Sequence, residues 1–425
     1  MLIKNVVIYK ENKGYCKVNI TIENDLIKSI DIIEESISTF DKINFYVTPG
    51  FVNSHLHPNQ LLDRRRLDLL SITNLLNQMH QDYKKTDEIR YFQALFVLID
   101  AIKAGATSVY SVASHPFPVI KAYKALGLKG AITCFFNDRW KEGGNAPSLS
   151  TYEEITTKFD LAYKEQNENI AIHVGAASAS TASDKLLLML NDLALKYKTK
   201  VNIHISEGIQ SVKSSLKSYK LTPVRFLESL GVLNSHWNLI HAVNIDEEET
   251  SLIAKRNTSI IHCPVSNAKT GVGIAPIKDW INNNITIGLG SDACSNNNTN
   301  NILNEAYFAS LLHSAYYENP QMLPTSTIFQ WLTKNGHKII GSKQTGMIEE
   351  GEKADLLLWD LNHHAFVPKN HKRFNSAILY NAPDIKPHTV IINGNVVVKN
   401  YKFLSMEEEK ISDFIHKKLD ERIML

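Results

Sequence analysis

The chain has 425 residues, enough for one large barrel with an accessory domain. Its composition is 44% hydrophobic and 21% charged, and a net charge of +2 with scattered Lys and Arg indicates no nucleic-acid surface. No stretch reaches 18 apolar residues and the N-terminus lacks an apolar signal core, so we expect no membrane span. The four cysteines are far apart without CxxC spacing, which favours a cytoplasmic protein without disulfides.

Residues 1–49 contain three short β runs, LIKNVVIY, CKVNITIEN and LIKSIDII. After Pro49 and Gly50, short apolar runs alternate with amphipathic helical stretches such as EIRYFQALFVLIDAIKAG and DKLLLMLNDLALKYK. The strand candidates are GFVNSH, ATSVYSV, KGAITCFF, NIAIHVG, KVNIHIS, WNLIHAV, TSIIHCP and ITIGLGSD. Eight such units predict an α/β protein with a (β/α)8 TIM barrel, the catalytic domain, over residues 50–345.

The β pattern resumes near Gly346 with ADLLLWD and HTVIINGNVVV. The closing run MEEEKISDFIHKKLDERIM predicts a charged surface helix. Because β segments stand on both sides of the barrel, residues 1–49 and 346–425 are predicted to form one small β-sandwich domain with the C-terminal helix. The barrel would then be inserted between the two halves of that domain.

The run TPGFVNSHLHPNQ places His55 and His57 at the end of the first barrel strand. Residues two apart on a strand point to the same side, so the two imidazoles form half of a metal site. Functional residues of a barrel gather at the carboxyl ends of its strands. The other polar residues at the expected strand ends are His173, His204, His241, His262 and Asp292.

Three neutral nitrogens and one carboxylate, from His55, His57, His204 and Asp292, form a ligand set that suits Zn²⁺ or Fe²⁺. We therefore predict one divalent metal ion per chain, Zn²⁺ in the first place and Fe²⁺ as the alternative. The fourth strand offers no Lys at its end, which disfavours a second metal bridged by a modified lysine.

Glu207 follows His204 by three residues and reaches the site only if the strand has ended by Ser206. There it would accept a proton from water and deliver it to the substrate. His241 would orient the water or polarise the bond under attack. Gln60 and His173 are candidates for substrate contacts, and Arg139, after the third strand, is a further one.

Several motifs resemble those of the amidohydrolase superfamily, in its branch of cytosine, guanine, chlorotriazine and adenosylhomocysteine/methylthioadenosine deaminases. They are HLH after PGFVNS, HISE, IHAV, HCPVSNAKTGVGIAP, GLGSD, and the closing GMIEEGEKADLLLWD and VIINGNVVV. The resemblance implies the same four metal ligands, with Glu207 as the proton shuttle and His241 in contact with water or substrate. Two segments, after His173 and after Asp292, differ from that branch, where they line the substrate pocket. The resemblance therefore implies the type of reaction more directly than the identity of the substrate.

These features predict a metal-dependent hydrolytic deaminase, an aminohydrolase, of an N-heterocyclic or cyclic amidine substrate. A metal-bound hydroxide would attack the carbon that carries the amino group, with Glu207, His241 and Asp292 as catalytic residues. The same site could instead hydrolyse a ring amide or another C–N or C–halide bond, and an inactive scaffold is a further alternative. We expect a small-molecule substrate and, from the resemblance, a homo-oligomer, most simply a dimer.

Overall fold

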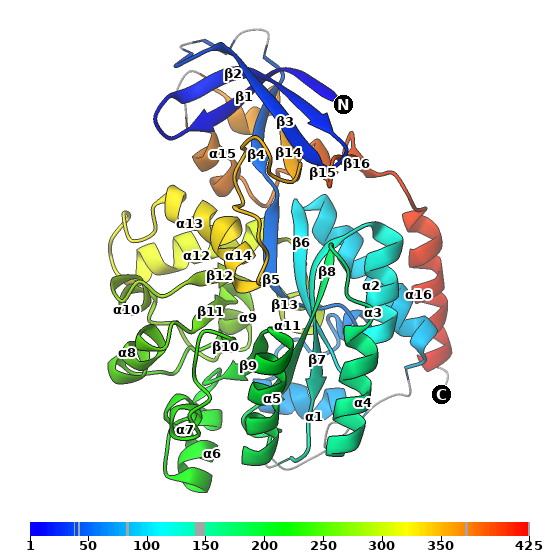
Figure 1. The fold of residues 1–425 in the computed structure, drawn as a ribbon, viewed down its shortest axis with the longest axis vertical. Helices are drawn as coiled ribbons and strands as arrows, with labels where there is room; N and C mark the ends of the chain where they lie inside the picture. Colours follow the sequence, from blue (N-terminus) through cyan, green and yellow to red (C-terminus); the bar gives the residue numbers. More distant parts are fainter. Residues whose placement is uncertain (38, 41–42, 82–84, 141–148, 370–372, 424–425) are drawn as a thin grey trace.

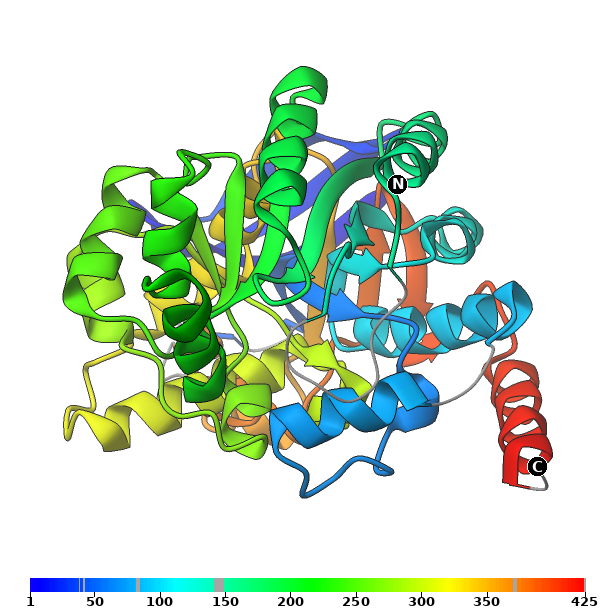
Figure 2. The same cartoon turned by 90° about the horizontal axis from the view of Figure 1, so that it is seen from below.

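A computed structural model describes the chain except residues 38, 41–42, 82–84, 141–148, 370–372 and 424–425 (Figure 1). Its described residues form two sheets. In Figure 1 a sheet built from the blue and orange parts of the chain lies at the top, above a second sheet surrounded by helices. Figure 2 turns the molecule to show, from below, the opposite end of this second sheet.

The second sheet is the predicted barrel. Its parallel strands follow one another in chain order, and β13 pairs with β5 through Asp292 and Leu56, which closes the sheet on itself. β12 and β13 are two pieces of the eighth strand, separated by Gly290 and Ser291. The strands are β5 Phe51–His57, β6 Ala106–Ala113, β7 Lys129–Phe136, β8 Ile170–Ser178, β9 Val201–Ile205, β10 Trp237–His241, β11 Ser259–His262, β12 Ile287–Leu289 and β13 Asp292–Ala293.

Helices separate the barrel strands and cover their outer side (Figure 2). Several begin at a polar cap such as Thr86, Thr151 or Ser183, whose side chain accepts a backbone N–H of the first turn. The helices up to the barrel's end are α1 Ile72–Gln81, α2 Asp87–Lys103, α3 Pro116–Leu126, α4 Tyr152–Tyr163, α5 Asp184–Tyr197, α6 Ile209–Tyr219, α7 Pro223–Ser229, α8 Glu247–Lys255, α9 Pro264–Lys269, α10 Ile277–Asn282, α11 Cys294–Asn297, α12 Ile302–Tyr316, α13 Thr325–Leu332 and α14 Lys334–Ile339, with the 3₁₀ turn η1 Leu61–Asp63.

The first sheet joins strands from both ends of the chain, as predicted. The parallel pairing of β1 with β4 and the antiparallel pairing of β4 with β14 place residues about 310 positions apart side by side: Trp359 pairs with Tyr46. Its strands are β1 Leu2–Lys10, β2 Gly14–Glu23, β3 Leu26–Glu34, β4 Phe45–Pro49, β14 Leu356–Asp360, β15 Thr389–Ile392, β16 Asn395–Lys399 and β17 Lys402–Phe403. The remaining elements of this part are η2 His364–Phe366 and α15 Phe374–Tyr380.

This sheet has two buried faces, which explains the apolar runs in its central strands. Val6, Ile8 and Leu356 point into a core of the sheet's own, while Val7 and Leu357 point into the barrel's core. The predicted sandwich thus takes the form of one continuous hydrogen-bonded sheet whose two halves share a core.

The junction between the two sheets depends on Gly50, the single residue between β4 and β5. A Cβ at this position would lie 2.0 Å from Oγ1 of Thr107, so any larger residue would push β6 away. The Gly50 N–H donates to the carbonyl of Asp355 at 2.9 Å. The contact with Asp355, which precedes β14, therefore helps to fix the start of β5, the strand that carries His55 and His57.

The predicted C-terminal helix is α16, Glu408–Ile423. It lies beside α2 of the barrel, where Phe414 stacks on Phe92 with ring centroids 4.0 Å apart and Lys103 pairs with Glu408 (Figures 1 and 2). The sequence assigned this helix to the β domain, and the structure instead places it on the barrel. The residue boundaries of the two domains otherwise stay a prediction. Among the described residues, no helix combines the length and apolar character that a membrane crossing needs.

Candidate metal centre

Four side chains from three separate barrel strands converge at the mouth of the barrel. His55 and His57 end β5, His204 lies near the end of β9, and Asp292 begins β13. Their ligand atoms all lie within 4.8 Å of one another. The strand alternation that predicted the His55 and His57 pair is confirmed, because both rings turn toward the same point.

The separations between these atoms fit one metal ion. Nε2 of His204 lies 3.2 Å from Nε2 of His55 and 3.3 Å from Nε2 of His57. Oδ1 of Asp292 lies 3.3 and 3.4 Å from the same two histidine atoms. A tetrahedron with zinc–ligand bonds of about 2.0–2.1 Å has edges of about 3.3–3.4 Å. The observed cluster therefore matches the cage that a zinc-sized ion needs.

The hydrogen bonds around the ligands fix which atoms face the centre. Nδ1 of His204 lies 2.6 Å from the carbonyl of Ala177, which can only accept, so Nδ1 carries the proton and Nε2 keeps its lone pair. Oδ2 of Asp292 accepts from Ser266 at 2.6 Å and from Asn296 at 3.0 Å, which leaves Oδ1 directed at the histidines.

Burial and mutual repulsion keep His57 and His204 neutral. Burial, with His55 as the next cause, lowers the pKa of His57 to about 3, and burial lowers the pKa of His204 well below its usual value. For Asp292 burial acts in the opposite direction, but the bond to His55 and the nearby histidines hold its pKa well below the usual carboxyl value. Neutral imidazoles and a carboxylate are the forms that bind a metal ion.

Glu207 reaches the centre because its strand ends before Ser206, which is the condition that the sequence set. β9 ends at Ile205, and Ser206 has a left-handed backbone with φ of 46°, which turns the chain over the mouth. Oε1 of Glu207 then lies 3.7 Å from Nε2 of His241. His241 is itself buried, and its Nδ1 lies 2.8 Å from Oδ1 of Asn267. The two side chains therefore face one space beside the four ligands.

A cavity of about 340 Å³ opens above the centre. The polar groups that line it include His57, His204, Glu207, His241 and Asp292. Apolar side chains form much of the remaining wall: Ile72, Leu75, Leu76, Val112 and Phe135. A wall of this kind suits a flat, apolar-faced ring whose polar edge meets the metal ligands.

Gln60 lies at this cavity, where the sequence placed it, but its nearest partner is a metal ligand. Its amide nitrogen is placed 3.3 Å from Nδ1 of His57 and its oxygen accepts from Ser295 at 3.0 Å. The two amide positions exchange readily, and a metal on Nε2 of His57 requires Nδ1–H to donate to the Gln60 oxygen. Gln60 thus holds the orientation of His57.

The predicted substrate contact of His173 is wrong. β8 does not end near His173 but continues to Ser178, so His173 lies near the opposite end of the barrel. Its Nδ1 bonds with Thr199 and with the N–H of Lys200, and its Nε2 lies 3.1 Å from the carbonyl of Ile340. Every polar atom of the ring is used within the protein, and the side chain does not line the cavity.

Arg139 lies beside the cavity without lining it. Its guanidinium donates to the carbonyl of Ala179 at 2.9 Å, lies 3.7 Å from Asp184, and stands 5.3 Å from the centre of the Tyr219 ring. These contacts hold the charge away from the centre, so the predicted substrate contact of Arg139 gains no support.

Sequence reasoning missed the residues that hold the catalytic groups in place. Ser266, Asn267, Ser295 and Asn296 bond to Asp292, His241 or Gln60. All four directly follow barrel strands or their polar ends, in HCPVSNAK and GSDACSNN. The available signal was this run of small polar residues just after a strand. His262, also at a strand end, pairs with His313 at 3.1 Å instead of joining the centre.

With this geometry in place, comparison with known proteins decides the family. The model of the Amidohydrolase family matches residues 46–397. The chain belongs to the amidohydrolase family. A 5'-deoxyadenosine deaminase of Methanobrevibacter smithii is 32% identical and is matched over 99% of this chain and 96% of its own length. A 5-methylthioadenosine/S-adenosylhomocysteine deaminase of Pyrococcus furiosus is 29% identical over 97% of this chain and 98% of its own.

Two solved structures with bound zinc share the fold. An atrazine chlorohydrolase from Arthrobacter aurescens TC1 complexed with zinc matches with a TM-score of 0.86 at 20% identity, covering 98% of this chain and 99% of its own. An adenosine deaminase from Xanthomonas campestris with bound zinc matches with a TM-score of 0.87 at 20% identity, covering 100% and 98%. At this identity the likeness shows the barrel and its composite sheet, and the predicted fold class is confirmed.

Proposed function

We propose that this amidohydrolase is a metal-dependent deaminase of adenine nucleosides, such as 5'-deoxyadenosine or 5-methylthioadenosine. The observation that carries the proposal is the complete His-His-His-Asp cluster in a chain that two named nucleoside deaminases match over nearly their whole length. The predicted class of reaction, hydrolytic removal of an amino group, agrees with both names. The adenine ring is a cyclic amidine and meets the earlier expectation of an N-heterocyclic substrate.

His55, His57, His204 and Asp292 would hold the metal, and we propose one Zn²⁺ per chain with Fe²⁺ as the alternative. A bound divalent ion supplies Lewis acidity, which brings the pKa of a bound water close to neutrality. The zinc in both solved relatives supports this choice of metal.

The other residues of the mouth would move and orient protons. Deamination adds the oxygen of water to the carbon that carries the amino group, and the two water protons end on the ring nitrogen and on the departing ammonia. Glu207 accepts a proton from the attacking water and delivers it to the ring nitrogen. His241 donates through Nδ1 to Asn267, which leaves Nε2 on the Glu207 side as an acceptor that orients the water. Asp292 assists as a second proton acceptor beside the same water.

The runner-up functions have less support. Removal of a halide or hydrolysis of a ring amide would use the same ligands, but the chlorohydrolase is only 20% identical, which supports the fold and no more. An inactive scaffold does not need the intact cluster. A homo-oligomer, most simply a dimer, and a cytoplasmic location also stay predictions. The four cysteines are all buried and unpaired, in keeping with a reducing compartment.

The test is ammonia release by zinc-loaded protein across a panel of substrates. The panel contains adenosine, 5'-deoxyadenosine, 5-methylthioadenosine, guanosine, cytidine and atrazine. We expect ammonia and the matching inosine product from the adenine nucleosides alone. Ammonia from guanosine or cytidine, or chloride from atrazine, without turnover of any adenine nucleoside would overturn the proposal.

A further inference from the structure

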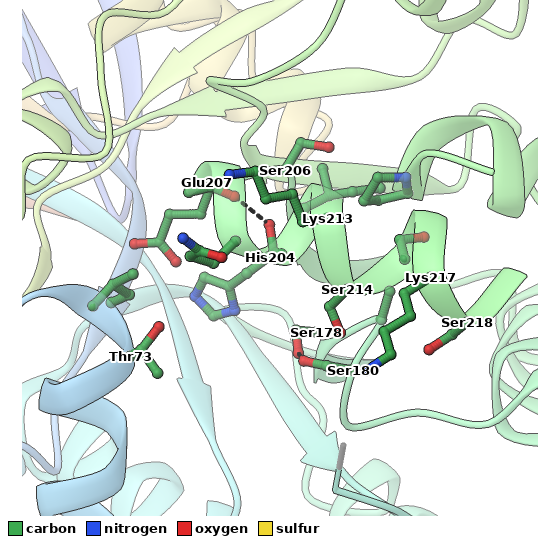
Figure 3. Close-up of a pocket in the computed structure, with 18 of the residues that line it drawn as sticks. Thr73, Ser178, Ser180, His204, Ser206, Glu207, Lys213, Ser214, Lys217 and Ser218 are labelled. Carbon is green, nitrogen blue, oxygen red and sulfur yellow. Dashed lines mark hydrogen bonds between the residues drawn. The ribbon is translucent and has the colours of Figure 1, made fainter. Parts of the chain in front are cut away.

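A second, larger cavity of about 730 Å³ lies against the metal centre, and Glu207 and His204 line both spaces. It runs between α1, the end of β8 and one side of α6. In Figure 3, Glu207 and His204 lie at one end of this space, and Lys217 and Ser218 lie at the other. A ligand bound at the metal centre can therefore continue along α6 without leaving the cavity.

The charge along this cavity changes sign away from the metal centre. Glu207 is the only acidic side chain among the described residues that line it, and it lies at the metal end. Lys213 and Lys217 line the remainder, and both are exposed at the rim. Within the part of the chain that the structure describes, neither lysine has an ion-pair partner, although the chain forms many other ion pairs. Their charge is available to a ligand.

Hydroxyl groups accompany the two lysines. Ser214 and Ser218 are one helical turn apart on α6 and form no hydrogen bond within the described residues. Across the space, Ser178 and Ser180 bond to each other at 2.7 Å. Lysine ammonium groups together with serine hydroxyls are donors that recognise a carboxylate or phosphate oxygen.

The helix spaces the two lysines along the cavity. α6 begins at Ile209, two residues after Glu207. At about 1.5 Å per residue, Lys213 and Lys217 lie about 6 and 12 Å along the axis from that first residue. A ligand anchored at Glu207 thus meets Lys213 first and Lys217 only if it has a longer extension. Arg139, held by Asp184 and the Ala179 carbonyl, does not line this space.

We propose that this cavity binds the 5' substituent of the nucleoside and that Lys213 and Lys217 select a substituent ending in an anionic group, a carboxylate or a phosphate. The inference rests on the proposed function, because the amino-bearing edge of adenine must face the metal ligands, which directs the sugar and its 5' carbon away from them. The cavity along α6 continues from the metal centre and carries the matching charge.

The test compares three substrates with the same base. 5-Methylthioadenosine has a neutral 5' substituent, S-adenosylhomocysteine ends in a carboxylate, and adenosine 5'-monophosphate carries a phosphate. We measure kcat/KM for each with the zinc-loaded wild type, with the double variant K213M/K217M and with the control K220M. Lys220 follows α6, has the same charge and does not line the cavity. Metal content and Tm of each variant check that it is folded.

In the double variant the ratio of kcat/KM for the preferred anionic substrate to that for 5-methylthioadenosine should fall by about tenfold, because exposed charge pairs are individually weak. The wild-type ratio should fall similarly when salt is raised. K220M should keep the wild-type ratio. The anionic substrate whose kcat/KM falls more in the double variant, the carboxylate or the phosphate, identifies the preferred anion. An unchanged ratio in K213M/K217M, with 5-methylthioadenosine still deaminated, overturns the inference alone. If the wild type deaminates none of these three and also neither adenosine nor 5'-deoxyadenosine, the proposed function itself is overturned.

Discussion

The two ends of the barrel use the same residue type in opposite ways. At the mouth, the Nε2 atoms of His55, His57 and His204 point at one another and at Asp292. At the other end, His173 bonds with Thr199, Lys200 and Ile340, so its ring has no atom left for a ligand. Position along the strand thus decides whether a buried histidine serves chemistry or packing. The same end holds the buried pair of Lys129 and Asp355, which joins the barrel to the composite sheet.

The largest expected effect comes from removing a ligand at the mouth. His55→Ala removes one of the four ligand atoms of the centre, so both metal and activity should be lost. We expect kcat/KM to fall by more than about 10⁴-fold, over 5 kcal/mol of transition-state stabilisation. Elemental analysis and the ammonia assay measure the two losses. A variant that keeps one metal and its activity would contradict the assignment of His55.

Glu207→Gln keeps the shape of the side chain and removes the base. Metal content should stay at the wild-type level while kcat falls by about 10²–10⁴-fold. Glu247→Gln, on the exposed first turn of α8, is the matched control and should keep full activity. Loss of metal in Glu207→Gln would make Glu207 a ligand, and unchanged kcat would remove it from the reaction.

Gln60→Ala should have a smaller effect, because Gln60 acts through His57. Loss of a residue that orients a metal ligand costs about 10–100-fold in metal affinity or activity. Gln60→Glu offers a carboxylate oxygen to Nδ1–H of His57 and should restore most of the metal affinity. If KM rises with unchanged metal affinity, Gln60 contacts the substrate instead, as the sequence first suggested.

At the end of the barrel opposite the mouth, a substitution of His173 should alter stability and leave the reaction intact. Burial lowers the pKa of His173 to about 4. Below pH 6.5 this histidine therefore takes up a proton in the unfolded chain, whereas in the folded chain it stays neutral until the pH approaches 4. This contribution to the free energy of unfolding is present above pH 6.5 and is lost as the pH falls toward 4, by up to about 3 kcal/mol.

In His173→Asn, urea unfolding of metal-free protein should therefore depend less on pH between 6.5 and 4 than in the wild type. Its kcat/KM at pH 7.5 should stay within about twofold of the wild type, provided that the variant is folded. A large loss of kcat/KM in a folded variant would show that the end of the barrel opposite the mouth takes part in the reaction.

The sequence predicted the centre well because each ligand lies at or near the end of a strand that can be recognised locally, and the barrel brings those strand ends together. Strand alternation put His55 and His57 on one side, and the condition set for Glu207, that its strand ends by Ser206, is met because β9 ends at Ile205. Non-local features could not be predicted in this way. The extension of β8 to Ser178 depends on its pairing with β7 and β9, which decides that His173 lies far from the mouth. The place of α16 depends on the half-buried ring of Phe92, which lies on a helix more than 300 residues earlier.

The most direct test of a single metal driving deamination at the mouth is a zinc titration of metal-free protein, followed by the rate of ammonia release from 5'-deoxyadenosine. The rate should rise linearly and reach a plateau at about one zinc per chain, with one inosine-type product formed for each ammonia. A plateau at two zinc ions per chain, a rate that does not depend on zinc, or the absence of ammonia at every ratio would contradict it.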